Sequence, residues 1–303
     1  MHDDLSYLAG PALRGRLAGT AGNDSAAAFI ARRYADLGLP GAFSDSSCGQ
    51  ERCNNNYFQF FRLTAPDIQN LDILVGDRTE NVGAIVQGLD SSLNRQFVIV
   101  GAHFDHIGRS NIYALDPVRF GIGRMHLGAD DNGSGTVAVL ELARRFADRP
   151  ARRSILFANF SAEELGLLGS KRFVAVSPIA IDSIAAMINL DMVGRLRENK
   201  LVLFDGTGSV RFHVIVDSVD HAPPDLNLHL TWRPSYRGPS DQMTFDAQRI
   251  PMLGLFTDYH PDYHTAEDVV DRINFPGMEK IVDFTERLVR AVADGRDRPA
   301  RRD

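Results

Sequence analysis

The chain has 303 residues, of which 44% are hydrophobic and 24% charged, a composition typical of a globular protein with a buried core. The formal net charge of −6 argues against the basic face that nucleic-acid binding requires. No apolar run reaches the roughly 18–20 residues that a membrane-spanning helix needs, so we expect no membrane span.

The amino-terminal part predicts one helix and a pair of edge strands. Residues 23–37 carry apolar side chains every three or four positions, the spacing of a helix face. Asn23 or Asp24 is expected to cap this helix. Alternating aromatic and β-branched residues over 57–75 and 81–86 then predict strands near a sheet edge.

The loop predicted over 41–56 contains the only two cysteines, Cys48 and Cys53. Their spacing predicts a short disulfide-closed loop, typical of proteins outside the cytoplasm, with two unrelated thiols as the alternative. The chain opens at Met1 without a signal-peptide pattern. We therefore expect either a cytoplasmic protein or the mature form of a secreted or periplasmic one, and the cysteines favour the latter.

Three continuous apolar runs have the length of buried central strands. The runs and the polar residues beyond them are 97–102 with His103, 154–160 with Glu163 and Glu164, and 184–190 with Asp191. Because ligands gather outside the carboxyl ends of strands in such sheets, these side chains are expected to converge.

Helices and strands alternate along the rest of the chain. Helices are expected over 131–148, near 168–174, and over 209–219 and 275–293, and strands over 201–204 and 251–256. The Gly-rich stretch 107–128 resembles a loop beside a site, and 294–303 a frayed tail. This alternation predicts an α/β fold, a sheet with helices on both faces. We expect a single domain over 1–303, with a helix and loop at 1–56 before a catalytic core at 57–293.

Five places supply residues that bind divalent metal ions. They are His103, Asp131, Glu163 with Glu164, Asp191 and His264. Two imidazoles and these carboxylates suffice for two adjacent cations with one carboxylate left as a base, the equipment of metal-assisted hydrolysis. Because adjacent side chains diverge, one glutamate can coordinate while the other takes the proton of an activated water.

Simpler interpretations of the acidic residues remain open. Asp131, in a Gly-flanked turn, is also a natural helix N-cap, and the two glutamates would complement a helix dipole. Asp191 can pair instead with Arg195 or Arg197.

The other histidines near these places have different expected roles. Asp105, two residues beyond His103 in an extended segment, can reach its ring and fix its tautomer. His106 is interpreted as a loop residue rather than a ligand, and His260 competes with His264 on spacing alone.

Taken together, the motifs resemble the M28 family of zinc peptidases, which contains secreted bacterial aminopeptidases. The motifs are Gly-Ala-His-Phe-Asp-His at 101–106, Gly-Ala-Asp-Asp-Asn-Gly-Ser-Gly at 128–135, Ser-Ala-Glu-Glu-Leu-Gly-Leu-Leu-Gly-Ser at 161–170, Asn-Leu-Asp-Met-Val-Gly at 189–194, Tyr-His-Thr at 263–265 and Leu-Arg-Gly-Arg-Leu-Ala-Gly-Thr at 13–20. The resemblance implies a three-layer α/β/α sandwich around a mixed, mostly parallel sheet of about eight strands.

The resemblance also implies two zinc ions and a role for each site residue. His103 and Asp191 would hold one ion, Glu164 and His264 the other, and Asp131 would bridge them. Glu163 would be the general base, Asp105 the partner of His103, and Tyr263 the donor to the oxyanion, with Tyr236 as the alternative donor.

The implied activity is removal of amino-terminal residues from peptides, by a protein for which a monomer is favoured. A carboxypeptidase or dipeptidase of the same family is the main alternative, with Arg233 and Arg237 as possible carboxylate partners. A glutaminyl cyclase or an inactive binding module would be expected to lack part of the ligand set. Two residues depart from the family pattern: Asn132, where an aspartate is frequent, and Gln242, in place of a histidine.

Overall fold

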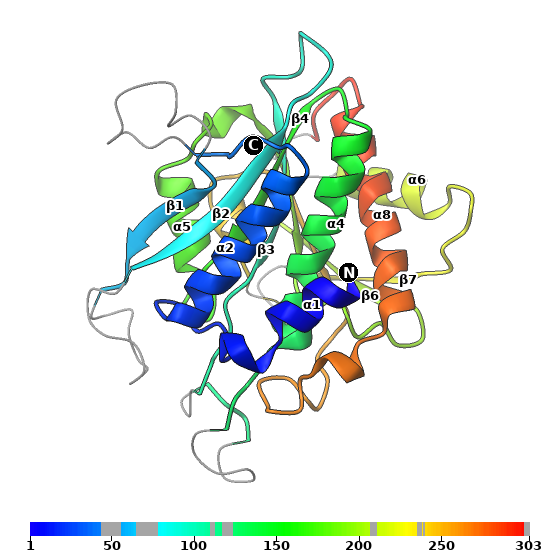
Figure 1. Cartoon of the computed structure of the whole chain (residues 1–303). Coiled ribbons are helices and arrows are strands. Elements are labelled where there is room, and N and C mark those ends of the chain that lie inside the picture. The colour runs from blue at the N-terminus through cyan, green and yellow to red at the C-terminus, as the bar shows by residue number, and fades with distance from the viewer. Residues whose placement is uncertain are drawn as a thin grey trace, which may run out of the picture.

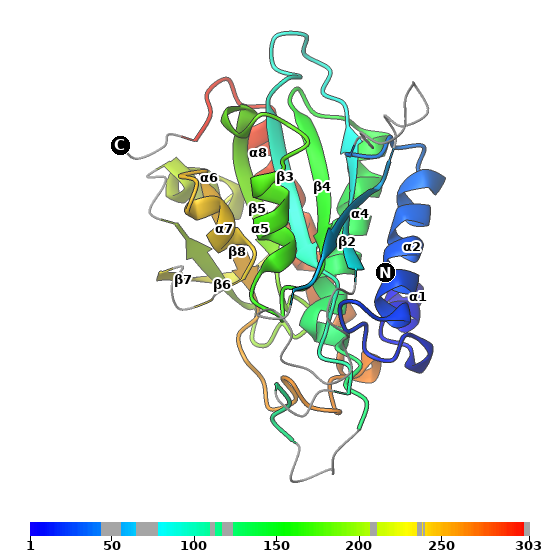
Figure 2. The same ribbon diagram turned by 90° about the vertical axis from the view of Figure 1, so that its left-hand side faces the viewer.

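A computed structural model describes residues 1–43, 56–64, 78–109, 113–116, 124–206, 211–234, 238 and 240–299. Within these ranges the strands form one eight-stranded mixed sheet, covered by helices on both faces (Figures 1 and 2). The predicted three-layer α/β/α architecture is confirmed. Cys48, Cys53, Tyr236 and Arg237 lie outside the described residues.

The sheet has the strand order β1-β2-β4-β3-β5-β8-β6-β7. The strands are β1 Phe58–Arg62, β2 Arg78–Val86, β3 Phe97–His103, β4 Ser154–Phe160, β5 Ile184–Leu190, β6 Lys200–Asp205, β7 His229–Pro234 and β8 Met252–Phe256. Strands β4, β3, β5 and β8 are neighbours and run parallel, and β6 pairs in parallel with β7. The pairs β1–β2, β2–β4 and β6–β8 are antiparallel.

The central strands read as continuous apolar runs because helices cover both of their faces. Every residue of β4 and β5 is buried. In contrast, only one residue of β1, at the edge of the sheet, is buried, and two are exposed. The three runs predicted as buried strands are all confirmed.

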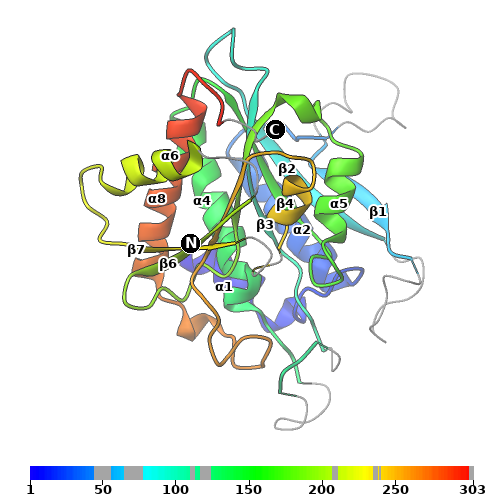
Figure 3. The same ribbon diagram turned by 180° about the vertical axis from the view of Figure 1, so that it is seen from behind.

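The helices divide between the two faces, as Figures 2 and 3 show. They are α1 His2–Leu8, α2 Ala21–Asp36, α4 Gly135–Asp148, α5 Leu168–Ala175, α6 Arg211–Asp220, α7 Gln242–Asp246 and α8 Phe275–Ala293. Apolar residues of α2, α4, α6 and α8 form one core with one face of the sheet. Phe173 of α5 and Phe245 of α7 pack with Phe160 and Ile99 on the other face. Among the described residues, no helix combines the length and apolar character needed to cross a bilayer.

Asn23 does not cap the helix that was predicted from it. Helix α2 begins at Ala21 with Thr20 at its N-cap position. Asn23 is buried, and its amide donates to the Arg16 carbonyl oxygen (3.1 Å) and accepts from the Thr79 hydroxyl (2.8 Å). The side chain therefore joins α2 to the start of β2.

The described part of the predicted tail, residues 294–299, forms hydrogen bonds with residues that precede two strands of the sheet. The Arg153 guanidinium is buried and donates to the carbonyl oxygens of Gly295 and Arg296. Arg298 donates to the side chain of Gln96 (3.0 Å). These contacts involve residues 295, 296 and 298, whereas fraying of the tail as a whole stays a prediction.

Candidate metal centre

Four neighbouring parallel strands carry most of the candidate ligands to one edge of the sheet. His103 ends β3, Glu163 and Glu164 follow β4, and Asp191 follows β5. His264 lies in the segment after β8. Parallel strands end on the same side, so the predicted convergence follows directly from the topology.

One group of side chains consists of His106, Asp131, Glu164 and His264, whose ligand atoms all lie within 4.8 Å of one another. The Nε2 atom of His264 is 3.0 Å from Oδ2 of Asp131 and 3.2 Å from Oε2 of Glu164. The Nδ1 atom of His106 is 3.0 Å from Oε1 of Glu164. All four residues are buried or nearly so.

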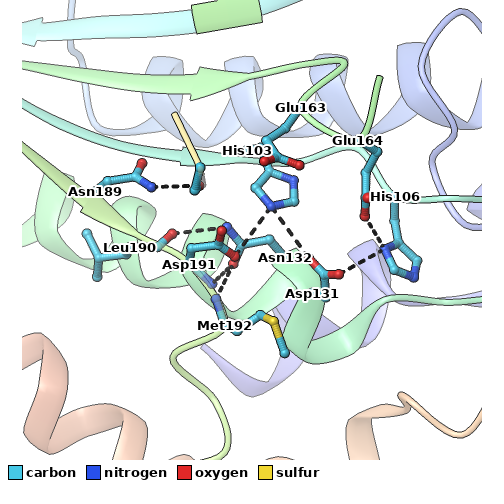
Figure 4. A network of polar contacts seen from close by, with 12 residues as sticks. His103, His106, Asp131, Asn132, Glu163, Glu164, Asn189, Leu190, Asp191 and Met192 are labelled. Atoms are coloured by element: carbon cyan, nitrogen blue, oxygen red, sulfur yellow. Dashed lines mark hydrogen bonds and ion pairs between the residues drawn. The ribbon is translucent and has the colours of Figure 1, made fainter. Parts of the chain in front are cut away.

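A second group, formed by His103, Glu163 and Asp191, lies beside the first. The Nε2 atom of His103 is 3.4 Å from Oδ1 of Asp191 and 3.5 Å from Oδ1 of Asp131. The other oxygen of Asp131 faces the first group. As Figure 4 shows, the Asp131 carboxylate therefore lies between the two groups, with one oxygen toward each.

The donor set fits divalent cations, zinc in particular. Imidazole nitrogens and carboxylate oxygens are the ligands of zinc sites in proteins. Oδ1 of Asp191 and Nε2 of His264 are buried without a hydrogen bond. Buried charged groups are costly unless they are paired or coordinate a metal. Cations bound between these groups would compensate the carboxylates.

The two adjacent glutamates have strongly different affinities for protons. Burial raises the pKa of Glu163 well above its usual value, and the neighbouring carboxylates of Glu164 and Asp191 add to this effect. Burial acts in the same direction on Glu164, but His264 and His106 lower its pKa well below the usual value. One carboxyl thus favours the protonated form and its neighbour the charged form, a pattern found in acid–base pairs.

Asp105 fixes the turn that carries these glutamates. Its carboxylate accepts hydrogen bonds from the backbone N–H groups of Glu163 (3.1 Å) and Glu164 (3.3 Å). The same carboxylate lies 3.6 Å from Nδ1 of His103, whose hydrogen-bond partner is the Asp105 carbonyl oxygen at 3.2 Å. Asp105 does reach the ring, as predicted, and it also orients the neighbouring ligand segment.

Buried hydrogen bonds to Asp268 and Asp130 hold the turn before α4 in place. The carboxylate of Asp268 accepts the backbone N–H groups of Asp130 and Asp131, each at 3.0 Å. Asp130 in turn accepts from Nε2 of His260 (3.1 Å) and from the backbone of Gly194 (2.7 Å). His260 is therefore engaged with Asp130 rather than with the two groups.

The arginines proposed as partners for Asp191 have other contacts. Arg195 binds the carboxylate of Asp262 (2.6 Å), and Arg197 donates to backbone carbonyls, including that of Thr257. Arg233 forms two hydrogen bonds with Asp258, of 3.0 and 2.8 Å.

Arg16 has a role near the site that its sequence position does not indicate, and it is fully buried. Its guanidinium donates to four carbonyl oxygens, at distances of 2.6–2.8 Å. They belong to Leu8, Phe104, Leu127 and Gly128. Burial lowers the pKa of Arg16 to about 10, while Asp268 and Asp105 oppose this effect. Arg16 thus ties the amino-terminal segment to both the 103–106 and 128–131 ligand segments.

A cavity opens beside the two groups of ligands. Met192, Phe204 and Phe256 contribute apolar side chains to its lining, and Tyr263, which also lines it, stacks on the ring of His264 at 3.9 Å between centroids. Gln242 lines the cavity too, where it accepts from Asn189 (2.8 Å) and donates to the Gly238 carbonyl oxygen (2.9 Å). The residue that departs from the family pattern therefore shapes the cavity.

Comparison with known proteins identifies the family. The model of peptidase family M28 matches residues 81–289 and so includes every residue of both groups. An aminopeptidase of Bacillus subtilis, YwaD, is 32% identical over 54% of this chain and 37% of its own length. A probable leucine aminopeptidase of Trichophyton verrucosum is 29% identical over 65% of this chain and 53% of its own length. The matches therefore span about a third to a half of these curated relatives.

Solved structures confirm the fold. A zinc aminopeptidase from Bacillus subtilis superposes with a TM-score of 0.71 at 18% identity, covering 97% of this chain and 94% of that one. A zinc-dependent exopeptidase from Parabacteroides distasonis gives a TM-score of 0.72 at 19% identity and covers 98% of each chain. The family model matches most of the length of the chain, and the fold and the site geometry agree with that match. The chain therefore belongs to peptidase family M28.

Proposed function

We propose that this protein is an aminopeptidase that uses two zinc ions to remove residues from the free amino termini of peptides. The observation that carries the proposal is the position of Asp131, whose carboxylate presents one oxygen to each of two ligand groups. A shared carboxylate of this kind suits a pair of adjacent cations. His103 and Asp191 would hold one ion, and Glu164 and His264 the other.

Zinc, when bound at this centre, would polarise the peptide carbonyl and lower the pKa of the attacking water. Glu163 would take the proton of that water, and its burial beside His103 and Asp191 supports this role. The same carboxyl would then give the proton to the leaving amine. The phenol of Tyr263, which lines the cavity, would donate to the oxygen of the scissile carbonyl.

The lining of the cavity argues against a free carboxylate as the anchored end of the substrate. Of the four carboxylates that line it, Asp131, Glu164 and Asp191 are the proposed zinc ligands and Glu163 is the proposed base. Among the described residues lining it, there is no lysine or arginine, and Arg233 is engaged with Asp258. A carboxypeptidase needs a cation for the terminal carboxylate of its substrate.

The proposal is tested with purified, zinc-loaded protein and a panel of aminoacyl-p-nitroanilides, each supplied with a free and an acetylated amine. We expect cleavage of the free-amine set alone, abolished by a chelator and restored by zinc. Cleavage of the acetylated set, or activity that survives complete zinc removal, would refute the proposal.

We also propose that the protein acts outside the cytoplasm, in the periplasm or as a secreted monomer. The proposal is supported by the spacing of Cys48 and Cys53. Mass spectrometry after alkylation without reductant should find both thiols blocked in protein from an oxidising compartment. Two freely alkylated thiols would contradict it.

A further inference from the structure

His106 lies in the loop that follows β3, as predicted, but it is fully buried and faces the metal centre. Its Nδ1 atom is 3.0 Å from Oε1 of Glu164 and 3.7 Å from Oδ2 of Asp131. Its ring meets that of His264 edge to face, with 5.5 Å between centroids. Figure 4 shows this nitrogen directed at both carboxylates.

The donor atoms of this group have the spacing of a single coordination shell. Zinc–nitrogen and zinc–oxygen bonds of about 2.0–2.1 Å in a tetrahedron place neighbouring donor atoms about 3.3 Å apart. Nδ1 of His106 is 3.0 Å from Oε1 of Glu164 and 3.7 Å from Oδ2 of Asp131, and Nε2 of His264 is 3.2 Å from Oε2 of Glu164 and 3.0 Å from Oδ2 of Asp131. His106 therefore faces the same two carboxylates as His264, at distances compatible with one coordination shell.

The surrounding backbone holds the ring in this orientation. A Cβ atom at Gly128, where φ is +62°, would stand 2.5 Å from Cγ of His106, so the ring packs directly on the glycine backbone. The Gly128 carbonyl oxygen is bound by Arg16, and the His106 backbone N–H donates to the Arg16 carbonyl oxygen. Nε2 of His106 is buried without a hydrogen bond, so the polar contacts of the ring are made through Nδ1 alone.

We propose that Nδ1 of His106 is a fourth protein ligand of the zinc ion held by Asp131, Glu164 and His264. The inference rests on the proposed two-zinc function and deepens it, because it makes the two sites unequal. Four protein ligands close a tetrahedral zinc site, whereas three leave a position for water or substrate. His103, Asp191 and Asp131 would form the open site, next to Glu163.

The competing explanation is that His106 only donates a hydrogen bond from Nδ1 to Glu164 and so positions that ligand. His106→Asn separates the two roles. The side-chain amide of asparagine reaches about as far as Nδ1 and can donate to Glu164, but it is a poor zinc ligand. His213→Asn is the matched control, because this histidine binds Asp205 (2.8 Å) away from the centre.

The experiment measures stepwise zinc affinities by competition with a chromophoric chelator, together with the visible absorption of the Co²⁺-substituted protein. In the wild type and in His213→Asn we expect one tight and one weaker site. In His106→Asn we expect the tight site to weaken by more than 100-fold, beyond the 10–100-fold that loss of a positioning partner costs, and the Co²⁺ bands to change. The melting temperature of the zinc-free variants checks that they fold.

Two other outcomes would each overturn a different proposal. An unchanged Co²⁺ spectrum in His106→Asn would overturn the ligand role, whatever the affinity, and leave the two-zinc proposal standing. Failure of the wild type to bind two zinc ions would instead overturn the proposed function itself.

Discussion

Glu163 and Glu164 are adjacent in the chain and yet belong to different ligand groups. The turn held by Asp105 sends one carboxyl toward His103 and the other toward His264. The imidazoles beside Glu164 favour its charged form, whereas Glu163 is buried among other carboxylates. Identical side chains thus acquire different chemistry from their surroundings.

Replacing Glu163 by glutamine should separate metal binding from catalysis. Since Glu163 is proposed to move protons rather than to hold zinc, Glu163→Gln should retain the zinc content of the wild type. Its kcat on a free-amine p-nitroanilide should fall by several orders of magnitude. Turnover within tenfold of the wild type would rule out Glu163 as the base, and Glu164→Gln, which should weaken zinc binding, provides the comparison.

Arg16 stabilises the structure around the site through its hydrogen bonds to backbone carbonyl oxygens. Arg16→Lys keeps the charge, but an ammonium group cannot reproduce the planar fork that serves four carbonyl oxygens. Because the loss leaves buried carbonyls without partners, we expect the free energy of unfolding to fall by about 3 kcal/mol. Denaturant unfolding of the zinc-free protein measures this change.

Arg144→Lys is the control for that experiment. Arg144 is exposed on α4 and pairs with Glu141 and Asp148. Such surface pairs contribute roughly 0–1 kcal/mol, so this variant should be close to the wild type. Equal effects of the two substitutions would mean that the contacts of Arg16 are not structurally important.

For individual residues, the sequence predicts the type of chemistry at the site better than it predicts the complete set of residues that form the site. The residues of the five predicted places do lie together, because each follows a strand or a glycine-flanked turn. His106 could not be singled out, since its contact with Glu164 joins segments far apart in the chain. Nor could Arg16, whose partners are backbone carbonyls, which carry no sequence signal.

Secondary-structure elements were predictable where burial makes a pattern. The central strands appear as apolar runs, and α8 has a clear amphipathic period. Strand β7 was not predicted, because none of its residues is fully buried and no apolar run marks it. Helices α1 and α7 were also missed, since seven and five residues are too few to establish a period.

Strand β2 contains a buried acidic residue whose ionisation should be visible in the stability of the protein. Burial, with Asp24 nearby, raises the pKa of Glu80 from 4.5 to about 7, and its Oε2 atom is buried without a hydrogen bond. Below pH 4.5 the carboxyl is protonated in both the folded and the unfolded state. Between pH 4.5 and 7 the folded state alone keeps the proton, so stability is lost as the pH rises through this window.

Glu80→Gln should therefore stabilise the protein selectively at high pH. Glutamine stays neutral, so we expect the variant to gain about 2–3 kcal/mol relative to the wild type at pH 8 and much less at pH 4.5. Urea unfolding of the zinc-free protein at both pH values measures the difference. The exposed Glu279 supplies the control: Glu279→Gln should change the free energy of unfolding by no more than about 0.5 kcal/mol, and a pH-independent effect of Glu80→Gln would contradict the assignment.

For the whole molecule, the four parallel strands β4, β3, β5 and β8 explain why ligands from 103 to 264 meet at one edge. The α/β class could be inferred from alternation along the chain. The strand order could not, because β8 pairs with β5 and β6 through contacts that no local pattern encodes.

Alanine substitutions of different zinc ligands should reduce the stabilisation of the protein by zinc to different extents. Asp131→Ala should weaken zinc binding at both sites, because its carboxylate faces both groups, whereas His264→Ala should weaken it at one; zinc content after gel filtration measures the difference. The rise in melting temperature that zinc produces should be smaller in Asp131→Ala than in His264→Ala, since an ion that binds only the folded state stabilises it by mass action. Equal zinc content in the two variants would mean that Asp131 does not serve both sites.

The position of β8 also constrains the order of events during synthesis. This strand is made after the other seven strands of the described sheet, yet it inserts between β5 and β6. His264 follows it, so a nascent chain that had already exposed His106, Asp131 and Glu164 would still lack the residue that completes their group. We therefore expect zinc to load onto a finished fold, as the last step of maturation, rather than to nucleate folding while the chain is still being translated.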